Sequence, residues 1–574
     1  MSGETRRIAK SVKPANGPTP SWHGLIGING IGILMLLGAF GWSMARVMTI
    51  HHELNDPSVI TLRISHWQLE SGFREAMQAV ITDYEQMHPG IRIVQMPVTE
   101  KVYAQWLNVN LIADNAPDLV EMGQSRMATT GDNIAKYFRP ISREMEEINP
   151  YNAPQYLEDL ADADPKLRNR LSTAPWRETV VDGMRGGYRA ELQDYFCVST
   201  SFFTVRMFYN KDMFKEVLGS EAPPTSLNEL FMMSEKLRAY AKAKGTVIDP
   251  IAGSSYSRGL FLWKYMTPFS ASFQPVVDWD GDGEMPPIET WAAFQHGAIG
   301  FGKPQMRAYY ESMRKLCTLF NPNFAAMDRD QAMSAFAQGQ AAMIASGSWD
   351  SASIFTAAKH FEVGVCNFPL PDPAIVGDDV VYPDNEASTA GGGSFGITKS
   401  SPHQAEALDF LRFLSSYKWD QKLNRLNGWL PVTIGATPDK RMMPFMPNPY
   451  GVSTVYDASN AYDLGTIMSG KLDLYLGGEI TYDEFASGVE SVMKDPNIGI
   501  DRIWRKQLET VSDQIRAADK TLAVQKYRML LGVAGTDTPA RVRETVIDQV
   551  SQTNGAWLRL MYQQLNQRAL PEQP

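Results

Sequence analysis

The first clear pattern is an alternation of apolar and polar side chains over residues 60–64, the spacing of a β-strand. Over residues 73–87 an apolar side chain recurs every three or four positions, as in an amphipathic helix. Further strands are predicted over 91–98 and 118–122, with another amphipathic run between them. This alternation of strands and helices predicts βαβ units and a mainly parallel sheet.

The segment before this region has a different character, because residues 24–45 (GLIGINGIGILMLLGAFGWSMA) contain no charged side chain. As a helix this stretch is roughly 33 Å long, enough to cross the apolar core of a bilayer. Arg6, Arg7, Lys10 and Lys13 precede it, which predicts a cytoplasmic N-terminus and an exported remainder. We therefore expect a retained single-pass anchor at 24–46. The alternative is a signal peptide cleaved after Ser43-Met44-Ala45.

Composition narrows the class of protein. The chain has 574 residues, 44% of them hydrophobic, so we expect more than one packed domain. The formal net charge is -10, which argues against nucleic acid as a partner. The only three cysteines are Cys197, Cys317 and Cys366. They are too few for a disulfide framework, and buried free thiols are expected.

Nine short blocks follow one another along the chain in a distinctive order. The first three are ITLRISHW, YEQMHPGIRIV and APDLVEMG: a strand ending in an aromatic residue, a helix closed by Pro-Gly, and a short strand. The others are VRMFYNKDMFKEV (205–217), PPTSLNEL (223–230), AFAQGQAAMIASGSWD (335–350), FPLPDP (368–373), GGGSFGITKSSPHQAEALDFLRFLSS (391–416) and NGWLPV (427–432). Each block alone is a weak signal, but their order is specific.

This order, from Ile60 to Val432, resembles that of the bacterial extracellular solute-binding proteins of carbohydrate ABC importers, the maltose-binding-protein class. The resemblance implies an α/β, bilobal periplasmic-binding-protein-like fold, here with an N-terminal transmembrane helix and extra C-terminal helices. It also implies lobes that close on a sugar or oligosaccharide and a complex that docks on ABC permease subunits. The expected segments are a cytoplasmic tail (1–23), the anchor (24–46), the N-lobe (57–200 and 386–435), the C-lobe (201–385 and 436–498) and a helical extension (499–574).

Residues at the predicted strand ends are the candidates for ligand binding, since ligands of α/β proteins bind beyond strand ends. A sugar has apolar ring faces and many hydroxyls, which suit aromatic rings beside carboxylates and amides. The candidates are Trp67, Gln68, Glu70, Gln124, Tyr209, Asn210, Trp349, Asp350 and Trp429. A structural role is the alternative: packing for each Trp, helix capping for Glu70 and Asp350, and a turn for Tyr209 and Asn210.

An acidic stretch matches the spacing of a calcium-binding loop, D-x-D-x-D-G-x5-E. Its candidate ligands are Asp278, Asp280, Asp282, the carbonyl of Glu284, and Glu289. Pro286 and Pro287 depart from the pattern, and an acidic Asp/Gly hairpin without metal is the alternative that the resemblance implies. No cofactor is required, and Ca²⁺ is the one candidate.

The chain carries no G-x-S-x-G, H-E-x-x-H or Walker-type motif, so a binding protein rather than an enzyme is expected. Two alternatives are a membrane-anchored glycan-degrading enzyme, which needs two positioned carboxylates, and a ligand-sensing subunit of a signalling receptor. Beyond a helix predicted over 481–493, an apolar seam runs from Trp504 to Leu522. It predicts helices packed on the C-lobe or a module for dimerisation or permease docking.

Overall fold

The computed structural model describes residues 59–69, 72–123, 131–189, 194–270, 273–278, 287–371, 391–447 and 462–499, with Leu37, Gly38, Leu192 and scattered positions of 501–527. Contacts divide the chain into one unit of residues 1–61 and 88–92 and another of residues 62–87 and 93–574. The elements below belong to the second unit, apart from the first residues of β1 and β2. Among the described residues, no helix is both long and apolar enough to span a membrane. The predicted anchor at 24–46 lies outside them, except for Leu37 and Gly38.

The alternation and the helical stripe at the start of the described chain form the elements that they predict. Leu62 and Ile64 of the first strand are fully buried, and so are Met77 and Tyr84 of the following helix. The elements are β1 (Ile60–His66), α2 (Phe73–Met87), β2 (Ile91–Pro97), α3 (Glu100–Ile112) and β3 (Leu119–Glu121).

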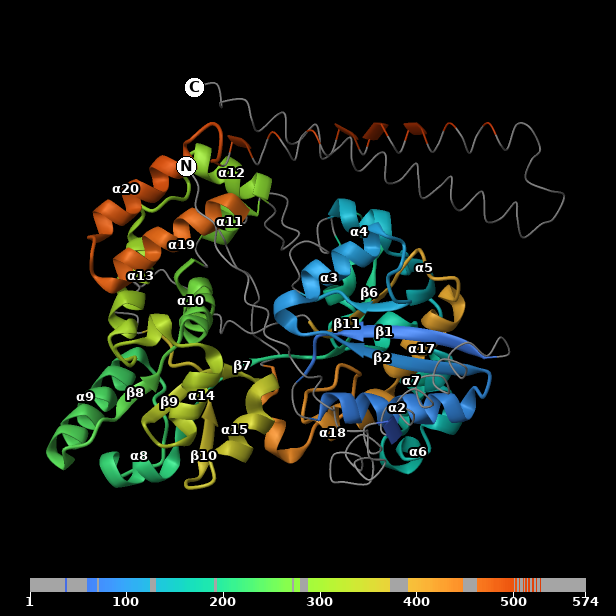
Figure 1. Cartoon of the computed structure of the whole chain (residues 1–574), viewed down its shortest axis with the longest axis horizontal. Helices are drawn as coiled ribbons and strands as arrows, with labels where there is room; N and C mark the ends of the chain where they lie inside the picture. The colour runs from blue at the N-terminus through green and yellow to red at the C-terminus, as the bar shows by residue number, and fades with distance from the viewer. Residues whose placement is uncertain are drawn as a thin grey trace, which may run out of the picture. The chain divides into compact units, whose positions relative to one another are not determined.

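The first sheet has the strand order β2-β1-β3-β11-β6, with β11 at Gly392–Ile397 and β6 at Cys197–Ser201 (Figure 1). Strands β1 and β3 are parallel, but β11 is antiparallel to both β3 and β6. Strands β1, β3 and β6 therefore run in the same direction, as predicted for a mainly parallel sheet, and β11 runs against them. Strand β11 departs because the chain returns to this sheet after β10 of the other sheet, and no βαβ crossover within the sheet sets its direction.

Helices α17 (Gln404–Leu414) and α18 (Tyr417–Asn427) follow the return strand β11 and pack with α2. The described chain between β3 and β6 forms short elements. They are α4 (Gly131–Tyr137), α5 (Ser142–Met145), η2 (Pro150–Asn152), η3 (Pro154–Tyr156), α6 (Leu160–Ala163), α7 (Pro165–Thr173), η4 (Trp176–Thr179), η5 (Arg185–Gly187), β4 (Tyr188–Arg189) and β5 (Asp194–Tyr195).

The second sheet has the order β10-β7-β9-β8. Its strands are β7 (Val205–Asn210), β8 (Asp249–Ala252), β9 (Ala341–Gly347) and β10 (Val363–Cys366). Strand β7 is antiparallel to both β9 and β10, while β8 and β9 are parallel. The accompanying helices are α8 (Lys211–Leu218), α9 (Leu227–Lys244), α10 (Ser255–Ser270), α11 (Gln274–Val277), α12 (Pro287–Gln295), α13 (Pro304–Cys317), η7 (Phe324–Ala326), α14 (Arg329–Ala337), η8 (Ser348–Asp350) and α15 (Ser351–Ala357).

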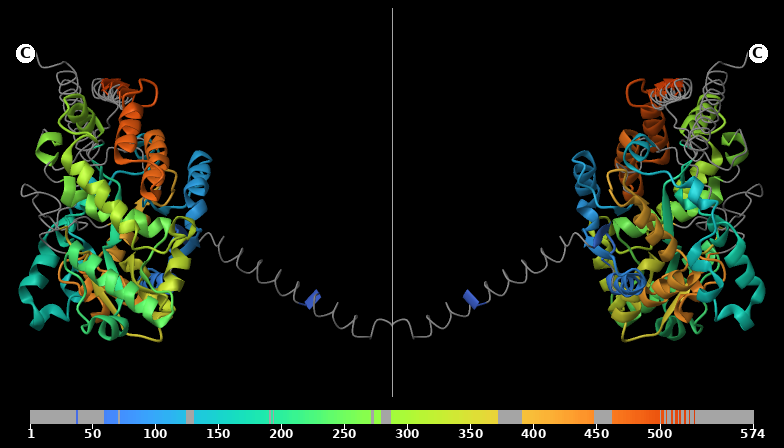
Figure 2. Two further views of the ribbon diagram at one scale, coloured as in Figure 1. Left: turned by 90° about the vertical axis from the view of Figure 1, so that its left-hand side faces the viewer. Right: turned by 90° about the vertical axis from the view of Figure 1, so that its right-hand side faces the viewer.

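Two further helices join the core of the second sheet, α19 (Tyr462–Gly477) and α20 (Tyr482–Met493). They run beside one another in both views of Figure 2, where they are orange. The predicted helix over 481–493 is confirmed, and Thr481 caps it in a capping box with Glu484. Ile515 of the later seam also packs against this core. The other apolar residues of the seam, Trp504, Leu508, Val511, Ala518 and Leu522, lie outside the described residues.

Short segments connect the two sheets, and the first of them is only residues 202–204. Phe202 forms a β-bridge with Leu430, and the Thr204 hydroxyl donates to the carbonyl of Phe445 at 2.6 Å. Phe445 ends η9 (Lys440–Phe445), which belongs to a later connection. The connecting segments thus bind one another as well as the sheets. The cysteines are free, as expected, with Cys197 and Cys317 buried and Cys366 partly buried.

Candidate functional site

Five aromatic rings, here called the ring row, run from the end of β1 to the end of β9. His66 contacts Phe73 at a centroid distance of 5.1 Å, and Phe73 contacts Trp429 at 4.9 Å. Phe203 then contacts Trp429 at 4.8 Å and Trp349 at 5.2 Å. Because Phe203 lies in the first connecting segment, the ring row links the two sheets through the point where the chain passes between them.

Trp67 follows His66 at the end of β1 and is held from three sides. Its backbone N–H donates to a Glu121 carboxylate oxygen at 3.1 Å, and its ring meets Tyr103 edge-on at 5.0 Å. A Cβ atom on Gly123 would lie 1.8 Å from Cη2 of Trp67, so only glycine leaves room for the indole. The side chain nevertheless stays partly exposed. Trp67 is therefore a fixed aromatic surface at a strand end.

The loop around Trp67 is organised by a buried carboxylate. Glu121 is fully buried, and it accepts hydrogen bonds from the Trp67 backbone and from the side-chain amide of Gln68. The Tyr103 hydroxyl lies 3.1 Å from the Ser65 hydroxyl, and burial raises its pKa well above the ordinary value. Gln68 is itself 4% exposed, so in this conformation it fixes the loop.

Trp349 has a similar setting at the end of β9. A Cβ atom on Gly347 would lie 2.3 Å from the indole, which is half-buried. The indole forms a hydrogen bond with the phenol of Tyr256 on α10. Burial raises the pKa of this phenol. The negative charges of Asp350 and of Glu100, which is on α3, also raise the pKa of Tyr256. The positive charge of Arg329 lowers it. Charged groups from α3 of the first sheet and α14 of the second thus both influence the pKa of this phenol.

Asp350 is 1% exposed and is neutralised by the protein itself. The Arg329 guanidinium binds both of its carboxylate oxygens, with Nε at 2.9 Å from one of them, and the Ser346 hydroxyl also donates to it. The side chain makes no capping hydrogen bond to α15, so the helix-cap alternative is wrong. This ion pair holds the segment that carries Trp349.

The structure does not bring Tyr209 and Asn210 to the same place. In the antiparallel β7–β9 pair, Val205 lies opposite Gly347, whereas Tyr209 lies opposite Met343. Tyr209 is therefore roughly 13 Å along the strand from the Trp349 end. The Asn210 side chain caps α8 by accepting from the Met213 N–H at 2.9 Å, and the Tyr209 ring packs 5.0 Å from Phe214. In this structure both residues therefore have the structural role that was the alternative to ligand binding.

Trp429 is 2% exposed and lies within the ring row, so it is a packing residue here. Its loop is held by the fully buried Asp420, which accepts from the N–H groups of Val432 at 3.0 Å and Thr433 at 2.9 Å. Burial raises the pKa of Asp420 to about 7, although these donors and Asn424 act to lower it.

The remaining candidates fall wholly or partly outside the described residues. Glu70 and Gln124 are not among them, nor are Asp280, Asp282 and Glu284 of the calcium loop. Asp278 is partly buried, and Glu289 is 1% exposed on α12. Within the described ranges, no three His, Cys, Asp or Glu side chains are grouped closely enough to hold a metal ion. The calcium loop therefore stays a prediction.

Four residues that support Trp67 and Trp349 are not among the candidates predicted from the sequence: Phe203, Tyr103, Tyr256 and Arg329. Phe203 had a usable signal, since it sits at the junction of two apolar strands. Arg329 and Asp350 are 21 positions apart, and nothing in their spacing indicates a pair. Tyr256 reaches Trp349 only because α10 packs against β9.

Comparison with known proteins places this geometry in a family. The family described as bacterial extracellular solute-binding protein matches residues 70–421. An uncharacterised ABC transporter extracellular-binding protein of Pyrococcus horikoshii is 22% identical over 385 residues, covering 66% of this chain and 73% of that protein.

Solved structures show the same fold. One, from work on xylan utilisation by the thermophilic bacterium Caldanaerobius polysaccharolyticus, has a TM-score of 0.52 at 15% identity and covers 75% of this chain and 99% of its own. RafE in complex with raffinose has a TM-score of 0.50 at 17% identity, covering 75% and 98%. Maltose-bound MalE3 of T. maritima has a TM-score of 0.50 at 15% identity, with the same coverage.

Proposed function

The chain belongs to the bacterial extracellular solute-binding proteins, and on that premise we propose that it captures a carbohydrate and delivers it to an ABC importer. One observation carries the proposal. Trp67 at the end of β1 and Trp349 at the end of β9 are both held rigidly and both keep part of their ring exposed. Rigid indoles suit the apolar faces of sugar rings, because little side-chain entropy is lost on binding. The raffinose and maltose complexes among the similar folds support this ligand class.

The setting of the carboxylates supports binding without chemistry. Glycoside hydrolysis needs two carboxyl groups that are available to the substrate, one of them to donate or accept a proton. Near the two tryptophans, Glu121 is engaged by Trp67 and Gln68, and Asp350 is engaged by Arg329. Both carboxylates are thus bound by groups of the protein that fix the local structure. We propose that the protein releases its ligand unchanged.

The connection between the sheets supports a closing motion. Residues 202–204 form a short link between the sheets. Within this link, Phe203 contacts Trp349 and Trp429 of the ring row. In the proposed mechanism, the halves built on the two sheets close around the sugar and exclude water. The liganded closed form then binds permease subunits better than the open form, which shifts the population toward it.

The apolar stretch at 24–46 is proposed to keep the protein in the inner membrane, with one span and the large C-terminal part in the periplasm or extracytoplasmic space. Such a tether raises the local concentration of the receptor near its permease. Cell fractionation tests it: the full chain is expected with the membranes after a high-salt wash, and a variant lacking residues 1–46 behind a cleavable export signal in the soluble fraction. Recovery of the full chain in the soluble fraction contradicts the anchor.

The sugar is identified by a thermal-shift screen of the full chain, in mild detergent, against mono- and oligosaccharides. A ligand is expected to raise the melting temperature, because it binds only the folded form. Each hit is then incubated with a small amount of protein, and the products are chromatographed. Stoichiometric binding of an intact sugar supports the receptor, and catalytic release of fragments contradicts it in favour of a glycan-degrading enzyme.

A further inference from the structure

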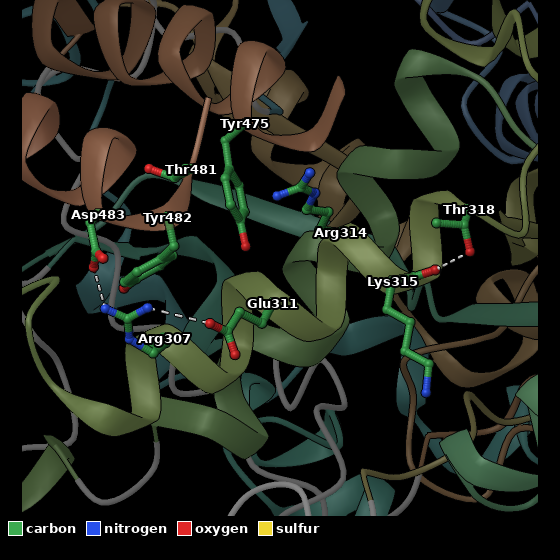
Figure 3. A pocket seen from close by; sticks show the side chains of 9 residues that line it. All are labelled: Arg307, Glu311, Arg314, Lys315, Thr318, Tyr475, Thr481, Tyr482 and Asp483. Carbon is green, nitrogen blue, oxygen red and sulfur yellow. Dashed lines mark hydrogen bonds and ion pairs between the residues drawn. The ribbon is translucent and has the colours of Figure 1, made fainter. Parts of the chain in front are cut away.

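A pocket of about 490 Å³ lies among the helices of the second sheet, lined by side chains of α13, α19 and α20 and by the residues that flank these helices. Figure 3 shows Arg307, Arg314 and Lys315 along α13. The side chains of Arg307 and Arg314 lie toward Tyr482 and Tyr475, whereas that of Lys315 extends away from both tyrosines. None of the residues of the ring row lines it. Its volume falls within the range typical of small-molecule sites.

The acidic side chains of the pocket are already bound. Arg307 forms ion pairs with Asp483 and with Glu311, both drawn in Figure 3. The Arg307 guanidinium also stacks over the Tyr482 ring, 4.3 Å from its centroid. One cation thus accounts for both carboxylates that line the pocket.

Among the residues that the structure describes, the other two cations of the pocket have no carboxylate partner. Within the described part of the chain, neither Arg314 nor Lys315 forms an ion pair, whereas Arg307 forms two. Arg314 lies over the Tyr475 ring at 5.3 Å and against Gly478, where a Cβ atom would come within 3.1 Å of Nη2. Lys315 holds its ammonium 3.9 Å from the centroid of Phe231. Aromatic contacts position both cations without neutralising them.

We propose that this pocket is a second binding site, for a small molecule bearing phosphate or carboxylate groups. Arg314 supplies a planar fork of donors, the geometry that recognises such anions, and Lys315 adds a second positive charge to the lining of the pocket. The net charge of the chain is -10, so an anion is repelled by the molecule as a whole. Binding therefore has to come from local contacts of this kind rather than from general attraction.

The experiment uses the full chain in mild detergent and chloride buffer, with inorganic phosphate and citrate as probes in calorimetric titrations. At least one probe is expected to bind saturably below ~10 mM, and the variant Arg314→Gln/Lys315→Gln to weaken it about tenfold or more. The control Lys359→Gln/Lys440→Gln removes the same charge from exposed positions elsewhere and is expected to leave binding unchanged.

Absence of saturable binding by the unaltered protein overturns the proposal, and so does an equal weakening in the control. If the double glutamine variant melts at a much lower temperature, Arg314→Lys replaces it: the charge stays but the fork is lost, and weaker binding is still expected. Unchanged affinity in that variant also overturns the proposal. Sugar binding is measured on the same variants and is expected to be unaffected, so the two sites succeed or fail separately.

Discussion

The ring of Phe203 meets the ring of Trp349 edge-on, with centroids 5.2 Å apart and planes at 69°. The same phenyl ring meets Trp429 at 4.8 Å and 84°. Phe203, in the connecting segment, therefore contacts both the half-buried Trp349 at the end of β9 and the buried Trp429. Any rearrangement of this segment has to move or release one of these contacts.

The two tryptophans beside Phe203 are expected to respond differently to truncation. Trp349→Ala removes a partly exposed ring, and we expect sugar affinity to fall roughly tenfold or more with a small loss of stability. Trp429→Ala leaves a cavity in a buried row and is expected to lower the free energy of unfolding by about 3–5 kcal/mol. Calorimetric titration and urea unfolding of both variants separate the two roles. Full sugar affinity in Trp349→Ala contradicts the proposed site.

A methyl group at Gly123 tests the position of Trp67. A Cβ atom there would fall 1.8 Å from the indole, so Gly123→Ala forces the ring to move. Sugar affinity is expected to drop by a factor of about ten, since the surface of the ring no longer faces the ligand. Gly90→Ala is the matched control, because a Cβ atom there meets nothing within 4 Å. An equal affinity in the two alanine variants would show that Trp67 takes no part in binding.

Arg329→Gln is expected to lower the free energy of unfolding by about 3 kcal/mol, because it leaves the buried Asp350 carboxylate without its cation. The side chains of this pair are 24% and 2% exposed. The comparison is Arg177→Gln, in the open pair with Glu146, whose side chains are 36% and 57% exposed. There we expect less than about 1 kcal/mol. Urea unfolding measures both, and similar losses would contradict a special role for the buried pair.

Stability is expected to depend on pH through Asp420. Burial raises its pKa in the folded protein from 3.8 to about 7. Between these values the folded form keeps a proton that the unfolded form has lost, so this contribution to stability is complete below about pH 4 and disappears as the pH rises through about 7. Its full size is roughly 4 kcal/mol.

The variant Asp420→Asn serves as the reference for this effect, because it cannot titrate. Urea unfolding from about pH 5 to about pH 8 is expected to show a steeper loss of stability in the unaltered protein than in the variant. Parallel pH profiles would show that Asp420 is already ionised across this range.

Much of the local structure follows from the sequence. The strand at the start of the described chain, the helix that follows it and α20 arise where periodicity places them, because a spacing of two or of three to four residues creates one apolar face. The ordered blocks also point to the family, because each block encodes a local turn, cap or strand that recurs in its members. Asn210 illustrates this well: the Tyr-Asn-Lys-Asp block marks the end of a strand and the cap of α8.

The sequence by itself determined the short-range elements, the family and the two half-buried tryptophans as candidates, because these depend on neighbours within a few residues. Only the tertiary structure decided which strand ends meet. Antiparallel pairing of β7 with β9 puts Val205 opposite Gly347, near Trp349, and leaves Tyr209 at the far end. Packing buries Trp429 and pairs Asp350 with Arg329. Such contacts join residues distant in the chain, and their free energy depends on burial and direction, which no periodicity along the sequence records.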